Sequence, residues 1–149
     1  MVTLRPYQKE CVERGLHFFN NEKVQKPKII VAPTAAGKSI IIAAIAAGLP
    51  GNVLVLQPSL ELLEQNFGKY CMYESNGSVY SASAGQKNIG KVTFATIGSI
   101  VRVSGLFNHF TALIIDEAHL YPPGNESMFG KFMSDNPQLK ILGLTADRK

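Results

Sequence analysis

The sequence of 149 residues lacks several features that mark particular protein classes. No apolar run approaches the roughly 20 residues that a membrane-spanning helix needs, and the apolar stretch 40–47 is much too short. No basic region followed by an apolar stretch opens the chain, so we expect no secretion signal. The two cysteines, Cys11 and Cys71, lack the spacing of a metal site, and we expect reduced thiols in an intracellular, cytoplasmic protein.

Internal repeats, linkers and low-complexity tracts are also missing from the sequence. With 46% hydrophobic and 17% charged residues, the composition is that of a folded domain and excludes a disordered chain. The length suits one domain, residues 1–149, with a core of its own. The net charge of +4 favours a polyanionic partner, although the lysines are dispersed and we interpret most of them as solvated surface.

Helical and strand-like segments alternate along the chain. This alternation predicts an α/β fold with a mostly parallel sheet and helices on both of its faces, and ligands then bind at the carboxyl ends of the strands. We expect loops at 83–90 and 120–125. The expected helices are 6–20, 38–47, 59–70, 97–103 and 127–133, and the expected strands are 28–31, 53–56, 78–82, 91–95, 112–115 and 140–144.

The segment Ala32–Ser39 has the pattern of a phosphate-binding loop between a strand and a helix. Backbone N–H groups of such a loop face the phosphates of a nucleotide. Lys38 is placed to reach the β- and γ-phosphates, and the Ser39 hydroxyl to bind Mg²⁺. Ala32 replaces the usual first glycine of this pattern. The alternative interpretation is therefore a simple turn at the start of an ordinary buried helix.

A second candidate site, Asp116-Glu117-Ala118-His119, follows the apolar run 112–115. Carboxylates at the end of a buried strand are costly unless a cation neutralises them, and the chain has only three aspartates. In phosphate-loop enzymes an aspartate at this place holds Mg²⁺ opposite the loop serine, so Asp116 and Ser39 are candidate metal ligands. Glu117 could then deprotonate the attacking water. The alternative is a strand followed by a charged turn.

Together these sites resemble the first RecA-like motor domain of superfamily 2 helicases of the DEAD/DEAH-box type. The likeness is greatest to RadD-like bacterial and phage DNA helicases and to restriction-enzyme translocases, and it covers nearly the whole chain. It implies ATP and Mg²⁺ as cofactors, a nucleic-acid partner with DNA expected over RNA, and nucleoid association in a bacterium. Six segments resemble family motifs in the right order: 4–8 for adenine recognition, 32–39 for motif I, 56–62 for Ia, 94–100 for Ib, 116–119 for II and 143–146 for III.

The resemblance assigns further residues to the nucleotide. The Gln8 amide can pair with adenine at two atoms, and the Arg5 guanidinium can stack on the base. The alternative for Gln8 is a solvated helix residue, because Pro6 suits a first helical position. His119 joins the catalytic set through motif II. The remaining motif I residues that would contact the nucleotide are Pro33, Thr34, Ala35, Ala36 and Gly37.

Two more segments would line the track of a nucleic-acid strand. Pro58 and Ser59 follow one strand-like run, and Thr96 and Ser99 follow another. Hydroxyl residues at a helix start leave backbone N–H groups that can bind a nucleic-acid phosphate. Simple N-capping by Ser59 and Thr96 is the alternative, and it is compatible with that role.

The last motif departs from the family. Thr145 and Ala146 match the start of motif III, which couples hydrolysis to movement, but Asp147 and Arg148 replace the usual continuation. Ala35 stands where many relatives have glycine, and it needs a negative φ.

The family also implies a second RecA-like domain that supplies an arginine finger. None of Arg5, Arg14, Arg102 and Arg148 fits that role, so we expect weak or no hydrolysis by these residues alone. The leading interpretation is the ATP-binding motor domain of an ATP-dependent DNA helicase or repair translocase. The alternatives are a duplex-DNA translocase of restriction or remodelling type, an RNA helicase, or a non-catalytic nucleotide-binding module.

Overall fold

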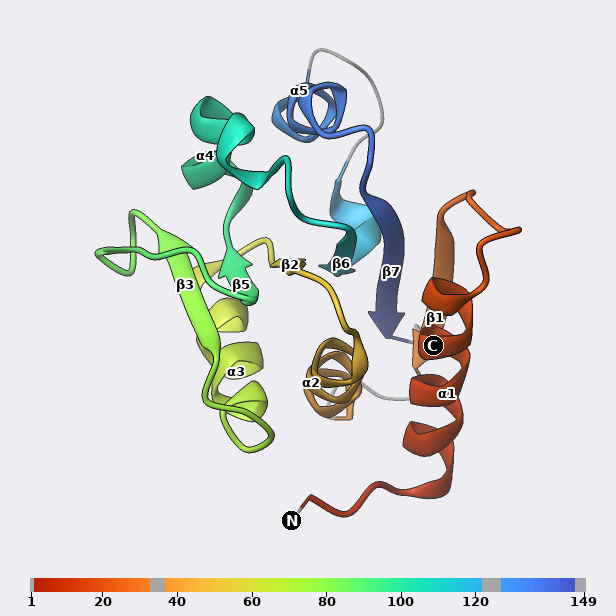
Figure 1. The fold of residues 1–149 in the computed structure, drawn as a ribbon. Helices are drawn as coiled ribbons and strands as arrows, with labels where there is room; N and C mark the ends of the chain where they lie inside the picture. The colour runs from red at the N-terminus through yellow and green to blue at the C-terminus, as the bar shows by residue number, and fades with distance from the viewer. Residues whose placement is uncertain (1, 33–36, 122–126, 147–149) are drawn as a thin grey trace.

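A seven-stranded sheet runs through the middle of the molecule (Figure 1). The computed structural model describes residues 2–32, 37–121 and 127–146. The strand order is β1-β7-β6-β2-β5-β3-β4, in which every neighbouring pair is parallel except β3 and β4. The strands are β1 (Lys28–Ala32), β2 (Val53–Leu56), β3 (Gly77–Ser81), β4 (Gln86–Lys87), β5 (Val92–Ala95), β6 (Ala112–Asp116) and β7 (Lys140–Ala146).

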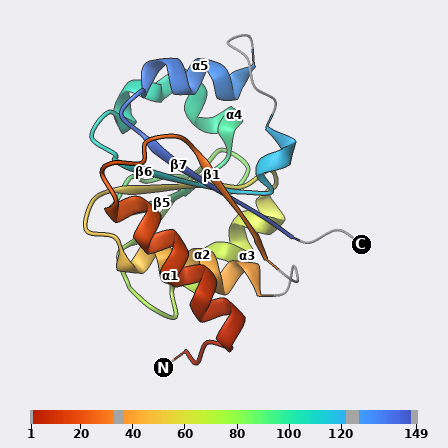
Figure 2. The same ribbon diagram turned by 90° about the vertical axis from the view of Figure 1, so that its right-hand side faces the viewer.

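Helices cover both faces of the sheet (Figure 2). One layer contains α1 (Pro6–Asn20), α2 (Lys38–Gly48) and α3 (Leu60–Tyr70). The other contains α4 (Ile97–Ile100), the 3₁₀ segment η1 (Val101–Phe107) and α5 (Met128–Asp135). A short 3₁₀ turn, η2 (Ala118–Leu120), follows β6. The predicted α/β fold with a mostly parallel sheet is confirmed.

Strand β2 shows how the sheet separates two cores. All four of its side chains are fully buried. Val53 and Val55 pack in the core beneath α1, α2 and α3, whereas Leu54 and Leu56 pack in the core on the other face. Because successive side chains of a strand point to opposite faces, a sheet covered on both sides needs apolar residues at every position. This need explains the continuous apolar runs in the sequence.

Some segments differ from the expected secondary structure. The predicted loop 83–90 contains β4, which pairs antiparallel with β3 after a turn at Gly85, whose φ of +68° suits glycine. The predicted helix 97–103 is wrong beyond Ile100: it continues as 3₁₀ turns to Phe107, with non-helical φ and ψ at Val103. Branched valines and a glycine are poor helix formers, which accounts for the break.

The expected loop 120–125 also starts later than predicted, since Leu120 belongs to η2. The rest of that loop, from residue 122, lies outside the described residues. Within the described part of the chain, no helix is both long and apolar enough to cross a bilayer.

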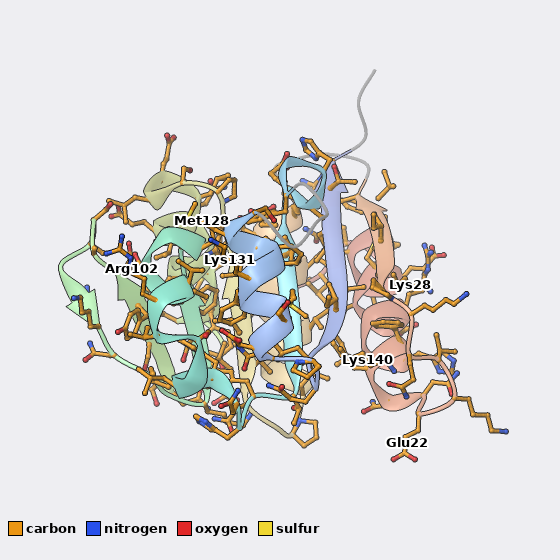
Figure 3. The ribbon with its side chains drawn as sticks, turned by 90° about the horizontal axis from the view of Figure 1, so that it is seen from above. Glu22, Lys28, Arg102, Met128, Lys131 and Lys140 are labelled. Carbon is orange, nitrogen blue, oxygen red and sulfur yellow. The ribbon has the colours of Figure 1, made fainter. Side chains whose placement is uncertain are left out.

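Two lysines, Lys91 and Lys140, are exceptions to the expectation that most lysines are solvated. Lys91 Nζ donates to the carbonyl oxygens of Leu49 and Gly51 at 2.8 and 3.3 Å. Lys140 Nζ donates to Asn21 O at 2.9 Å and lies 4.5 Å from the ring centroid of Phe18. Figure 3 shows Lys140 at the end of β7 that faces α1. Lys91 thus bonds to the segment between α2 and β2, and Lys140 bonds to the end of α1.

Candidate nucleotide-binding site

The carboxyl ends of β1, β7 and β6 bring three predicted motifs together. Leu144 of β7 lies between Ile30 of β1 and Asp116 of β6 in the strand register. The segment after β1 leads into α2, which begins at Lys38. Motifs I, II and III therefore meet at one edge of the sheet, as expected for a parallel fold. Pro33, Thr34, Ala35 and Ala36 lie outside the described residues, as do residues 147–149.

Lys38 and Asp116 form a buried ion pair at this edge. Lys38 Nζ lies 2.8 Å from Asp116 Oδ1, and the side chains are 5% and 0% exposed. Lys38 also pairs with Glu117 Oε1. Taking a carboxylate out of water is costly unless a cation is close, so Lys38 compensates the charge that β6 brings into the core.

Glu117 has an unusual backbone conformation. Its φ of 56° and ψ of 49° place it in the left-handed region, and it has the only positive φ of a non-glycine residue in the described ranges. Such a conformation is unfavourable for a residue with a side chain and concentrates at functional sites. It turns the chain directly after β6, so that Asp116 and Glu117 can both reach Lys38.

A chain of polar contacts continues from Glu117 to motif III. His119 Nε2 lies 3.5 Å from Glu117 Oε2, and His119 Nδ1 lies 3.3 Å from Thr145 Oγ1. Ala146, the other predicted coupling residue, ends β7 beside Ala32 and has no polar side chain. Thr145 thus connects motif III to motif II by a polar side-chain contact.

The two candidate metal ligands are joined by a residue that the sequence reasoning missed. Ser39 Oγ donates to Asn66 Oδ1 at 2.7 Å, and Asn66 Nδ2 donates to Asp116 Oδ2 at 3.0 Å. Asn66 is fully buried in α3. The signal was present in the sequence: Asn66 follows Leu63 by three residues and precedes Tyr70 by four, which puts an amide on the apolar face of a helix.

Gln57 holds the other side of Asn66. Asn66 Nδ2 also donates to Gln57 Oε1 at 3.2 Å. Gln57 Nε2 in turn donates to the carbonyl oxygens of Val55 and Ala95 at 3.2 and 3.1 Å. Gln57 is 1% exposed, and both its amide oxygen and its amide nitrogen are hydrogen-bonded within the protein. Buried polar atoms usually have such partners.

The donor atoms at this edge suit a magnesium ion. Mg²⁺ prefers oxygen ligands, and the site offers the Ser39 hydroxyl and the Asp116 carboxylate. Asp116 Oδ1 is buried and accepts no hydrogen bond from the described residues, although Lys38 lies beside it. Because the Ser39 proton points to Asn66, the lone pairs of Ser39 Oγ are left for a cation.

The expected adenine motif lies against the end of the phosphate-binding loop. Gln8 is 5% exposed, and its Oε1 accepts from the Arg5 backbone N–H at 2.8 Å, which satisfies one donor at the start of α1. The alternative of a solvated Gln8 is therefore wrong. A Cβ at Gly37 would collide with the Tyr7 hydroxyl and approach Gln8 Nε2, so a larger residue there would displace these two side chains. The sequence analysis assigned no role to Tyr7, whose hydroxyl lies close to Gly37. Arg5, the other predicted adenine-binding residue, is exposed.

The predicted nucleic-acid residues lie at the carboxyl ends of β2 and β5. Ser59 is the N-cap of α3, where its Oγ accepts from Leu62 N at 3.2 Å, and it is exposed, as is Pro58. Thr96 precedes α4 but its side chain makes no capping bond, so that expectation is wrong. Instead Thr96 Oγ1 lies 2.9 Å from Ser99 Oγ, which accepts from Ala82 N.

Two further features lie on the α5 side. Burial, together with the nearby Asp116 carboxylate, raises the pKa of Tyr121. A surface hollow of about 500 Å³ also lies between η1 and α5 and is lined by Arg102 and Lys131 among others. Figure 3 labels both side chains on this helix layer. None of the predicted site residues lines the hollow.

The sequence is similar to those of two archaeal proteins that are named for action on DNA. The chain is 29% identical over 148 residues to the DNA 3'-5' translocase XPB2 of Sulfurisphaera tokodaii, which covers 97% of this chain and 31% of that protein. It is 28% identical over 155 residues to the putative DNA 3'-5' helicase Rad25 of Haloarcula marismortui, covering 97% of this chain and 22% of that one. The chain thus spans about a third or less of these relatives.

Structural comparison points the same way. The UvsW helicase of bacteriophage T4 superposes with a TM-score of 0.71 at 25% identity, over 97% of this chain and 52% of that chain. The family described as Type III restriction enzyme, res subunit, matches residues 1–147. The match covers almost all of the sequence and includes the motifs that meet at the sheet edge. The chain therefore belongs to this family and has the fold of the N-terminal RecA-like domain of superfamily 2 helicases.

Proposed function

We propose that this domain binds Mg²⁺-ATP at the edge formed by β1, β6 and β7, and that it drives movement of a longer protein on DNA. One observation carries the proposal: Lys38, Ser39, Asp116 and Glu117 converge there from two distant segments of the chain. A buried lysine between two carboxylates is poised to exchange partners when phosphates arrive. A non-catalytic nucleotide-binding module would not need Glu117 held in a strained conformation beside that lysine.

Each side chain then has a separate role. Lys38 moves its ammonium from the carboxylates to the β- and γ-phosphate oxygens. Ser39 and Asp116 would hold Mg²⁺, which would supply further neutralisation of the phosphate charge. Glu117, released from Lys38, orients a water molecule and takes its proton. Gln8 and Arg5 recognise the adenine, and the non-proline residues of the predicted loop 33–37 would offer backbone N–H groups to the phosphates.

His119 and Thr145 couple this chemistry to movement in our proposal. Glu117 contacts His119, which contacts Thr145, so a shift of the glutamate reaches β7 in two steps. Pro58, Ser59, Thr96 and Ser99 provide the nucleic-acid side, where the exposed Ser59, the half-buried Thr96 and Ser99, and helix-start N–H groups can bind phosphates of one strand.

We further propose that full activity needs a second RecA-like domain that contributes an arginine finger. The relatives support this idea because each is at least about three times as long as the matched region. DNA is favoured over RNA because both relatives are named as acting on DNA. Translocation on duplex DNA is the second candidate, supported by the restriction-enzyme family and by the name of the XPB2 translocase.

Nucleotide binding is tested by titrating ATP, with and without Mg²⁺, into the 149-residue chain. Loss of the charge-assisted contacts in Lys38→Ala should weaken Mg²⁺-ATP binding by about tenfold or more. Lys131→Ala, which removes an exposed lysine on the α5 side, is the matched control. Unchanged affinity in a folded Lys38→Ala protein would refute the phosphate-binding loop.

The nucleic-acid substrate is tested with the longer protein that contains this domain. ATP hydrolysis is measured with single-stranded DNA, duplex DNA and RNA. Greatest stimulation by single-stranded DNA supports the helicase, and greatest stimulation by duplex DNA supports the translocase. Stimulation by RNA alone would contradict a DNA motor.

A further inference from the structure

Asn66 occupies a place between three groups that belong to different parts of the site. It comes from α3, whereas Ser39 comes from α2 and Asp116 from β6. Its Oδ1 accepts from Ser39 Oγ at 2.7 Å, and its Nδ2 donates to Asp116 Oδ2 at 3.0 Å and to Gln57 Oε1 at 3.2 Å. Both ends of this fully buried amide are therefore engaged.

This arrangement fixes the direction of two hydrogen bonds that matter for a cation. An amide oxygen can only accept, so the Ser39 hydroxyl must turn its proton toward Asn66 and its lone pairs elsewhere. An amide nitrogen can only donate, so it engages Asp116 Oδ2 and leaves Oδ1 beside Lys38. No other side chain type of this size donates and accepts at such separate atoms.

Gln57 makes the position of Asn66 independent of the nucleotide. Its amide nitrogen bonds to the carbonyl oxygens of Val55 and Ala95, at the ends of β2 and β5. These two strands pair in register, with Leu56 opposite Ala95. The amide of Asn66 is thus held by the backbone of the central sheet and not only by the groups that it orients.

We propose that Asn66 is a positioning residue for the metal-binding pair, Ser39 and Asp116, and that Gln57 holds it in place. The inference rests on the proposed Mg²⁺-ATP site. Asn66 itself does not contact the ion; it orients the two ligands before the ion arrives. Residues that orient metal ligands by hydrogen bonds typically change metal affinity by 10–100-fold when they are removed.

The test separates the affinity for Mg²⁺ from the affinity for the nucleotide. ATP binding to the 149-residue chain is measured at rising Mg²⁺ concentrations for wild type and Asn66→Leu. We expect the Mg²⁺ concentration for half-maximal enhancement to rise about tenfold or more, while the metal-free ATP affinity changes less than about threefold. General damage to the fold would lower both affinities together.

The chain offers a matched control in Asn136. This asparagine is also fully buried, and its Nδ2 bonds to the carbonyl oxygens of Ser104 and Phe132, remote from the metal ligands. Asn136→Leu makes the same chemical change and should leave the Mg²⁺ dependence as in wild type. An equal loss of Mg²⁺ affinity in both variants would overturn the assignment of Asn66.

A measurement on the unaltered protein covers the case in which Asn66→Leu does not fold. In the ¹H–¹⁵N spectrum, the Nδ2 protons of Asn66 should exchange slowly with solvent and shift when Mg²⁺ is added to the ATP complex. Fast exchange and no shift would overturn the proposal.

The outcomes also separate this inference from the proposed function. If Mg²⁺ does not increase the ATP affinity of the wild-type protein, the proposed function and the role of Asn66 are both refuted. If wild type responds to Mg²⁺ and folded Asn66→Leu responds equally, only the role of Asn66 falls.

Discussion

Lys38 Nζ lies 2.8 Å from Asp116 Oδ1 in a place where both side chains are almost completely buried. The lysine that is proposed to bind phosphate therefore also neutralises a core carboxylate when no nucleotide is bound. The two tasks compete for one ammonium group. Their competition affects the stability of the domain as well as its affinity for ATP.

Removal of Lys38 should destabilise the nucleotide-free protein. Lys38→Ala leaves Asp116 buried without its cation, and breaking a buried pair in this way costs about 3–5 kcal/mol. Urea denaturation should show that loss in the free energy of unfolding. The double variant Lys38→Ala/Asp116→Asn should recover most of it, since the uncompensated charge is gone. A double variant no more stable than Lys38→Ala would contradict this account.

The left-handed conformation of Glu117 predicts an unusual order of two substitutions. Alanine and glycine both remove the carboxylate, so both lose the contacts with Lys38 and His119. Only glycine relieves the left-handed strain, which is about 1–2 kcal/mol for a residue with a side chain. Glu117→Gly should therefore unfold at higher urea concentration than Glu117→Ala. The reverse order would mean that position 117 carries no such strain.

Tyr70 predicts a loss of stability at alkaline pH. Burial, followed by the charges of Glu74 and Cys71, raises the pKa of Tyr70 to about 12, above its usual value of 10.0. Between pH 10 and 12 the unfolded chain releases this proton while the folded protein keeps it. Stability is therefore complete below pH 10 and falls as the pH rises, at up to about 1.4 kcal/mol per pH unit.

The comparison for that prediction is Tyr70→Phe, which removes the titrating hydroxyl and its hydrogen bond to Asn76. Its urea midpoint should be lower at neutral pH and should fall less steeply between pH 10 and 12. Parallel declines in the two proteins would show that Tyr70 does not contribute to the alkaline loss.

The two cysteines should differ sharply in reactivity. Cys11 is buried, and burial raises the pKa of its thiol, whereas Cys71 is exposed. The thiolate is the reactive form, so a disulfide reagent at pH 8 should modify Cys71 rapidly and Cys11 only as the protein opens. Cys71→Ser should abolish the rapid phase and keep the slow one. A rapid phase that survives in Cys71→Ser would place Cys11 within reach of solvent.

Much of this structure could be predicted because its signals are local. The apolar run of β2 predicted a strand with the observed bounds, Val53–Leu56. The start of α1 at Pro6 followed from a first-turn proline. The grouping of Lys38 with Asp116 followed from the pattern of phosphate-loop enzymes, together with the rule that parallel strands share their carboxyl ends.

The remaining features depend on contacts between distant segments. The helix pattern marks Asn66 as an amide on an apolar face, but its partner Asp116 lies 50 positions later in the chain. Tyr7 gains its meaning from the close approach of Gly37. Thr96 looks like an N-cap, but the nearby Ser99 and Ser81 hydroxyls take its hydrogen bonds. In each case the partner could not be identified from neighbouring residues.

The position of β7 has a consequence for the order in which the domain can assemble. This strand, the last of the seven in the chain, lies between β1 and β6. Until residues 140–146 leave the ribosome, β1 and β6 have no common neighbour, and motifs I and II cannot be held at one edge. A growing chain should thus form the proposed nucleotide site in a single late step, once β7 is available.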